Sequence, residues 1–163
     1  MTDKVQLKIG LDYHGVVNVR PEYFAAFARE ALRRGHEVHI ITGGPYKVVE
    51  AQLKKQHIVY TRIFAILDYY DARGEVTYFE NGEYHIPDKL WDSAKAEYCS
   101  AEGINMHIDD SREYIKWFTT PYCHYENNGE ECITENGRRV DFNTPPAEAL
   151  DRIEQIVSSV QYY

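Results

Sequence analysis

The sequence predicts an α/β protein with a parallel β-sheet and helices on both faces of the sheet. Two observations carry this prediction. Short apolar segments alternate with longer segments in which apolar residues recur at helical spacing, and this alternation is typical of βαβ crossovers. Asn-Gly pairs inside two further segments predict β-hairpins beside the parallel core.

The first half of the chain shows the clearest alternation. Residues 5–11 predict a strand, and a helix follows from Pro21 to Gly35, because proline suits the first turn of a helix and glycine its end. The next elements are a strand at 36–42, a helix at 46–56 and a strand at 60–67. Helices between consecutive strands predict that these strands run parallel.

The second half begins with a hairpin over residues 75–86, centred on Asn81-Gly82. A helix over 88–103 follows, with Asp88 as its expected cap and Gly103 as its end. The remaining elements are a strand at 104–110, a helix at 111–118, a strand at 121–126, a hairpin at 133–142 around Asn136-Gly137, and a helix at 146–160. The whole pattern predicts a three-layer, Rossmann-like arrangement in one domain, residues 1–163.

Composition argues against several classes of function. The formal net charge is −8, whereas general binding to nucleic acids requires clustered Lys and Arg. Cys99, Cys123 and Cys132 form no CxxC pair, which argues against a disulfide framework or a zinc site and favours a reducing compartment. The first residues, MTDKVQLKIG, lack the long apolar segment expected of a secretory signal, and the sequence contains no run of about 18 apolar residues. We therefore expect a cytoplasmic protein without membrane binding.

Polar residues gather where the predicted strands end. In open parallel sheets, ligands bind at the carboxyl ends of the strands. A carboxylate, a hydroxyl, a lysine and a pair of acidic residues at that edge form a set suited to phosphoryl chemistry. The members of this set are Asp12 with His14, Thr42, Lys95, and Asp109 with Asp110.

The order of these residues resembles the haloacid dehalogenase superfamily. Asp12 precedes Gly15-Val16 after the first strand, Thr42-Gly43 follows the second, a helical lysine comes next, and Asp109-Asp110 ends a later strand. The resemblance covers roughly residues 5–125, and the hairpin at 75–86 resembles a minimal cap that replaces a full cap domain. It implies a Mg²⁺-dependent phosphohydrolase that acts through an aspartyl-phosphate on a small phosphorylated metabolite or nucleotide.

The resemblance also implies a role for each residue. Asp12 is the nucleophile, and Mg²⁺ is held by Asp12, the backbone carbonyl of His14 and Asp110, with Asp109 nearby to orient Lys95. The hydroxyl of Thr42 and the amide of Gly43 bind phosphoryl oxygens. Lys95 offsets the charge of Asp12 and of the phosphate. The predicted site residues are therefore Asp12, His14, Thr42, Gly43, Lys95, Asp109 and Asp110.

His14 departs from the pattern of this superfamily. Its phosphatases usually carry a second aspartate at this position, which acts as general acid and base. An imidazole is able to do both, since its ordinary pKa of about 6.5 lies near the working pH. Protonation of His14 beside Mg²⁺ and Lys95 is disfavoured by like charge. His14 is therefore an acid/base, a mark of altered chemistry, or a side chain that only packs.

Several alternatives stay open at this stage. Lys89 competes with Lys95 as the site lysine, and Asp109-Asp110 is also placed to cap the helix expected at 111–118. A catalytically weak Mg²⁺- and phosphate-binding module is the alternative function. Metal-free cleavage of carbon–halogen bonds is a third, against which the paired Asp109-Asp110 argues. Formation of a homo-oligomer is left open.

Overall fold

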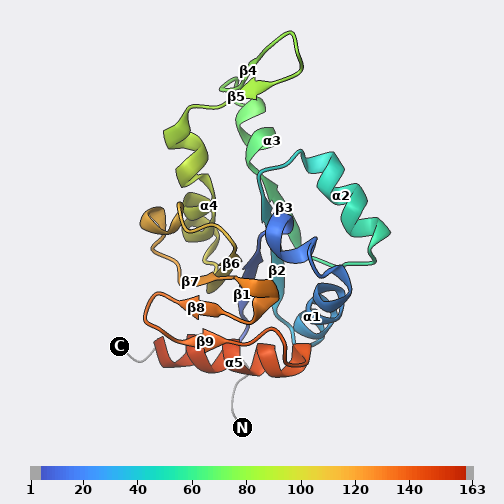
Figure 1. The fold of residues 1–163 in the computed structure, drawn as a ribbon, viewed down its shortest axis with the longest axis vertical. Helices are drawn as coiled ribbons and strands as arrows, with labels where there is room; N and C mark the ends of the chain where they lie inside the picture. The colour runs from blue at the N-terminus through green and yellow to red at the C-terminus, as the bar shows by residue number, and fades with distance from the viewer. Residues whose placement is uncertain (1–4, 161–163) are drawn as a thin grey trace.

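A computed structural model describes residues 5–160 of the chain. Its centre is a seven-stranded sheet in the order β3-β2-β1-β6-β7-β8-β9 (Figure 1). The parallel strands are β1 (Lys8–Leu11), β2 (Glu37–Thr42), β3 (Arg62–Ala65), β6 (Met106–Asp109) and β7 (Tyr122–His124). Two antiparallel strands, β8 (Cys132–Thr134) and β9 (Arg139–Val140), complete one edge. The predicted α/β fold is confirmed.

Helices cover both faces of the sheet (Figure 1). One core lies under α1 and α5 and includes Phe24 and Ile153, and the opposite core lies under α3 and α4 and includes Tyr70 and Cys99. Because side chains of a strand alternate between faces, Ile40 of β2 belongs to the first core and Ile41 to the second. The helices are α1 (Pro21–Arg33), α2 (Tyr46–Lys55), α3 (Ile66–Asp71), α4 (Asp88–Glu102) and α5 (Pro146–Val160).

Both predicted hairpins are present. β4 (Thr77–Tyr78) and β5 (Tyr84–His85) pair antiparallel and project beyond α3 at one end of the molecule (Figure 1). Gly82 and Gly137 have φ angles of 84° and 79°, which glycine adopts readily and other residues avoid. The Asn-Gly pairs therefore mark the turns, as expected from the sequence.

The predicted helix at 111–118 is wrong. The structure has only one 3₁₀ turn there, η2 (Ile115–Trp117). The Ser111 amide donates to Asp109 Oδ1 at 3.0 Å, and the Tyr122 hydroxyl donates to the Ser111 carbonyl. The Tyr122 hydroxyl thus occupies the Ser111 carbonyl, which would accept from the amide of residue 115 in an α-helix, whereas the Ser111 amide is a first-turn donor that a helix leaves free.

The predicted strand at 60–67 and the cap at Asp88 also need correction. The strand ends at Ala65, and α3 begins directly because Ile66, Leu67 and Tyr70 are buried at helical spacing. Asp88 is the first residue of α4 rather than its cap, and its side chain makes no capping hydrogen bond. A carboxylate in the first turn still interacts favourably with the helix dipole.

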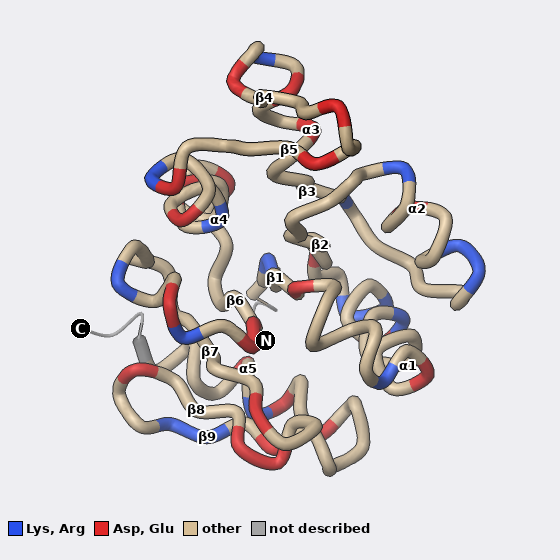
Figure 2. The backbone as a smooth tube through the Cα atoms, turned by 45° about the horizontal axis from the view of Figure 1, so that its top comes forward, with Lys and Arg blue, Asp and Glu red and all other residues tan. Residues whose placement is uncertain are grey.

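Three further properties concern the molecule as a whole. No helix within residues 5–160 is long and apolar enough to cross a membrane. In the view of Figure 2, Lys and Arg lie between acidic residues on several helices rather than along one continuous face. Cys99, Cys123 and Cys132 are buried and free of disulfide bonds within the described chain.

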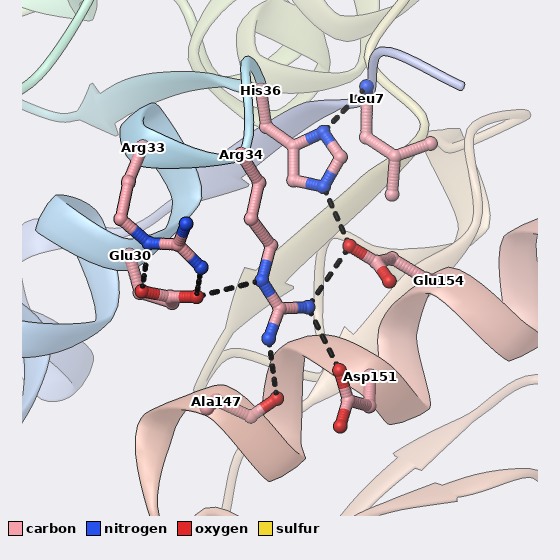
Figure 3. Close-up of polar contacts among 8 residues, drawn as sticks. All are labelled: Leu7, Glu30, Arg33, Arg34, His36, Ala147, Asp151 and Glu154. Carbon is pink, nitrogen blue, oxygen red and sulfur yellow. Dashed lines mark hydrogen bonds and ion pairs between the residues drawn. The ribbon is translucent and has the colours of Figure 1, made fainter. Parts of the chain in front are cut away.

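A partly buried polar network joins α5 to residues that directly precede β1 and β2 (Figure 3). The Leu7 amide donates to His36 Nδ1 at 3.0 Å, and His36 Nε2 donates to Glu154 Oε1 at 2.8 Å. Arg34 reaches the same Glu154 oxygen at 3.0 Å. Partial burial alone would raise the pKa of Glu154, but the bonds from His36 and Arg34 lower it below its ordinary value.

We expect Glu154→Gln to lower the free energy of unfolding by about 1 kcal/mol at pH 7. Because the pKa of Glu154 is lower in the folded protein, its contribution is fully present above 4.5 and is lost as pH falls through the folded value. Urea unfolding at pH 7 and at lower pH measures the difference. Glu50→Gln, at an exposed site on α2, is the control, and a Glu154→Gln effect that persists at low pH would contradict this account.

Candidate functional site

The site begins where β1 ends. Asp12 follows Leu11 directly, and its amide donates to the Ile108 carbonyl of β6 at 2.9 Å. This bond continues the sheet by one residue and leaves the Asp12 side chain at the strand tip, with 5% of the residue exposed. A tight turn over Tyr13–Val17 follows. The strand thus delivers a carboxylate that is nearly buried and fixed by its own backbone.

The turn after Asp12 is shaped around Asp110. Gly15 has a φ angle of 91°, which favours glycine. A Cβ atom at Gly15 would also collide with the carboxylate of Asp110. Glycine is therefore required twice over, and its absent side chain lets the Asp110 carboxylate pack against the loop that follows β1.

Lys95 lies at the centre of the site. It comes from α4, is 6% exposed, and donates to Asp12 Oδ1 at 3.0 Å and to Asp109 Oδ2 at 2.8 Å. Lys89 is exposed to solvent. The structure therefore places Lys95, and not Lys89, between the two carboxylates.

The two adjacent aspartates have different surroundings. Asp109 is wholly buried, whereas Asp110 is exposed. Asp109 Oδ1 accepts from the Ser111 amide, and Asp109 Oδ2 accepts from Lys95 and His107. Asp12, Asp109 and Asp110 each offer an oxygen atom, and these atoms lie within 4.8 Å of one another. Asp110 is the member of the pair whose carboxylate remains open to solvent.

The charges of this cluster do not balance. Burial raises the pKa of Asp12 well above its ordinary value, against the opposing effect of Lys95. Burial acts in the same sense on Asp109, but Lys95 and His107 outweigh it and lower the pKa of Asp109. Burial disfavours the charge of Lys95, yet both carboxylates overcome this and raise its pKa. Two of the carboxylates thus compete for one ammonium group.

Thr42 and Gly43 lie at the end of β2, beside β1 in the sheet. Thr42 is fully buried, and its Oγ1 accepts from the Gly44 amide at 3.3 Å. A Cβ atom at Gly43 would lie 2.9 Å from Cη2 of Trp91, so the indole ring covers this part of the backbone. Glycine is required here because the ring approaches so closely.

His14 does not join the buried cluster. Its side chain is exposed and packs edge-on against the ring of Tyr13, with ring centres 5.1 Å apart. Within residues 5–160, no hydrogen bond or ion pair joins the imidazole to Asp12, Lys95 or Asp110. At position 14 the loop therefore offers its backbone to the site, and the imidazole lies at the edge of the site.

Sequence reasoning missed two sets of neighbours. His107 contacts Asp109, and a signal was present, because alternation along a strand places residues 107 and 109 on one face. Trp91 and Tyr114 lie next to each other beside Lys95. The indole Nε1 donates to the Tyr114 hydroxyl at 3.1 Å. Lys95 Nζ lies 5.8 Å from the centre of the Tyr114 ring. No spacing rule links these two aromatic residues.

Comparison of the chain with models of known protein families finds no match, and comparison with curated protein sequences finds none either. The site is therefore interpreted from its own geometry. A nearly buried carboxylate, a lysine bound to it and an exposed second carboxylate at one strand edge form an oxygen-rich, acidic centre with one fixed cation.

We expect Lys95→Met to lower the free energy of unfolding by about 3–5 kcal/mol, because it leaves two buried carboxylates without their cation. Chemical denaturation at neutral pH in the presence of a chelator measures the change. Lys89→Met is the matched control on the same helix and is expected to stay within about 0.5 kcal/mol of the parent. Equal effects of the two substitutions would show that Lys95 does not compensate the buried charge.

Proposed function

We propose that the protein is a Mg²⁺-dependent phosphohydrolase that forms an aspartyl-phosphate on Asp12 and acts on a small phosphorylated metabolite or nucleotide. The observation that carries the proposal is the arrangement around Lys95, whose ammonium group joins Asp12 to Asp109 beside the open carboxylate of Asp110. This is the constellation that the sequence resemblance leads one to expect.

The residues present fit a magnesium ion. All three side chains of the cluster offer oxygen atoms, which Mg²⁺ prefers, and Mg²⁺ usually takes only one or two protein carboxylates. Three carboxylates and one ammonium group also leave a formal charge of −2 when all are ionised. We propose Asp12, Asp110 and the His14 carbonyl as ligands. Asp109, whose two oxygens already accept hydrogen bonds, orients Lys95 instead.

The proposed chemistry assigns a step to each of these residues. Asp12 attacks phosphorus, the ester bond breaks, and the leaving alcohol takes a proton from His14. Water then attacks the aspartyl-phosphate, His14 takes up a proton of that water, and phosphate and free Asp12 are restored. Thr42 and the Gly43 amide donate to the phosphoryl oxygens, while Lys95 offsets the charge of Asp12. Bound Mg²⁺ neutralises charge on the phosphoryl group.

A phosphatase substrate panel tests the proposal. We expect release of phosphate with Mg²⁺ and none after chelation, and loss of activity in Asp12→Asn, because an amide is not a nucleophile toward phosphorus. Asp88→Asn, an exposed aspartate on α4, should retain parental activity. Activity that survives chelation, or that Asp12→Asn retains, would exclude the mechanism.

The exposure of His14 favours one alternative, a Mg²⁺- and phosphate-binding module with weak turnover. The imidazole has no contact with Asp12 within the described residues, so the general acid is less firmly held than the nucleophile. In this alternative, Asp12, Lys95 and Asp110 bind metal and phosphate, but the leaving group receives no proton.

His14 variants separate the two functions. If His14 protonates the leaving group, His14→Ala should slow hydrolysis of alkyl phosphates by on the order of 10²-fold, and of aryl phosphates far less, because aryl leaving groups need little protonation. Steady-state kinetics at saturating Mg²⁺ measures both substrates. Equal losses for both would exclude the acid role. An inert parent that becomes active in His14→Asp would establish the binding module.

A further inference from the structure

His107 occupies the centre of β6 and is completely buried. In the sheet it lies between Gly10 of β1 and Tyr122 of β7. Its ring stacks on Phe118, with centres 5.3 Å apart and planes 3° from parallel, and it meets Tyr122 edge-on at 5.7 Å. The imidazole is therefore held from both neighbouring strands and from the segment that covers them.

The imidazole has one polar contact in the described chain. Its Nε2 lies 2.9 Å from Asp109 Oδ2, the same oxygen that accepts from Lys95 Nζ at 2.8 Å. A carboxylate only accepts hydrogen bonds, so Nε2 carries the proton. The other ring nitrogen, Nδ1, has no partner within the described chain.

The sheet makes room for this ring at the expense of its own stability. A Cβ atom at Gly10 would lie 2.7 Å from His107 Nδ1, so any other residue would displace the imidazole. A glycine inside a strand weakens it, and a buried acceptor without a partner is unfavourable. An apolar pair at positions 10 and 107 would pack without either defect. The benefit that offsets both is the hydrogen bond to Asp109.

We propose that His107 is a positioning residue that fixes the carboxylate of Asp109 and thereby holds the Lys95 ammonium group in place against Asp12. The proposal rests on the phosphohydrolase function above. Asp109 is anchored on Oδ1 by the Ser111 amide and on Oδ2 by His107, so its carboxylate has one orientation. Lys95 bridges this fixed oxygen and the Asp12 oxygen. The position of the Lys95 ammonium group beside Asp12 therefore depends on a series of hydrogen bonds that begins at the His107 imidazole.

Removing the imidazole should act on turnover rather than on substrate binding. His107 contacts none of the groups proposed to bind metal or phosphate, which are Asp12, Asp110, Thr42, Lys95 and the loop backbone at residues 14 and 43, and it reaches Lys95 only through the shared oxygen of Asp109. Its loss frees Asp109 to rotate and loosens Lys95. The affinity for substrate should remain, while the rate of attack by Asp12 falls.

The test compares His107→Met, which removes the donor, with His107→Gln, whose side-chain amide is able to donate to Asp109 from a similar distance. We expect His107→Met to lower kcat by about 10-fold to 100-fold, the usual range for groups that support a reactive residue, with KM little changed. His107→Gln should restore most of kcat. His39→Met is the control, because His39 is a buried strand histidine bonded to Tyr98 and Glu37 and, within the described residues, to none of Asp12, Lys95 or Asp109.

Thermal unfolding of all three variants separates positioning from stability. A loss of stability alone would lower Tm in His107→Met and His39→Met and leave kcat unchanged at a temperature well below both transitions. The proposal is overturned if His107→Met keeps kcat within two-fold of the parent, or if His107→Gln loses as much as His107→Met.

A second readout keeps the inference testable without activity. If the parent hydrolyses no phosphate ester, the proposed function fails, and NMR of the amine protons of Lys95 then reads the positioning directly. Held between two carboxylates, these protons should exchange slowly with water in the parent and in His107→Gln, and faster by at least 10-fold in His107→Met. Equal exchange rates in the parent and in His107→Met would overturn the proposal.

Discussion

The site depends on two buried ion pairs, which join the ammonium group of Lys95 to Asp12 and to Asp109. A buried charge is tolerated only when it is paired and hydrogen-bonded. The pairing therefore fixes how three elements must meet: β1 and β6 lie side by side and lead to the carboxylates, and α4 packs on one face of the sheet and supplies the lysine. A shift of α4 along its axis would separate Lys95 from both partners.

One lysine cannot serve two buried carboxylates equally. Asp109 keeps its charge, with Lys95, His107 and the Ser111 amide all donating to it. Asp12 has Lys95 alone among side-chain donors in the described chain, and burial raises its pKa. The protein thus stabilises the residue that orients the lysine and leaves the strand-tip carboxylate less satisfied. A carboxylate with few donors at a strand tip is a candidate for binding a cation or for reacting.

The sequence alone predicts most of the sheet and the strand-end residues, because helical spacing, Asn-Gly turns and breakers are local signals. It mispredicts the segment 111–118, where the Ser111 carbonyl accepts from Tyr122 of β7, a residue distant in sequence, and only a single 3₁₀ turn forms. His107 was missed for a related reason: inside a buried strand, a histidine looks like one more core residue. Alternation along β6 indicates that residues 107 and 109 share a face, but the space for the ring is left by Gly10, on a strand distant in sequence.

In the proposed mechanism, the backbone carbonyl of His14 binds the metal and its side chain acts as acid and base. The loop after β1 keeps these two roles apart. Its path is set by the Asp12 amide bonded to Ile108, by the positive φ of Gly15, and by the Asp110 carboxylate packed against that glycine. None of these constraints involves the side chain at position 14, which points to solvent. We therefore expect the backbone at this position to keep its path when the side chain changes from histidine to aspartate. It follows that any difference in chemistry between the two side chains arises at the rim of the site, without a change in the buried centre.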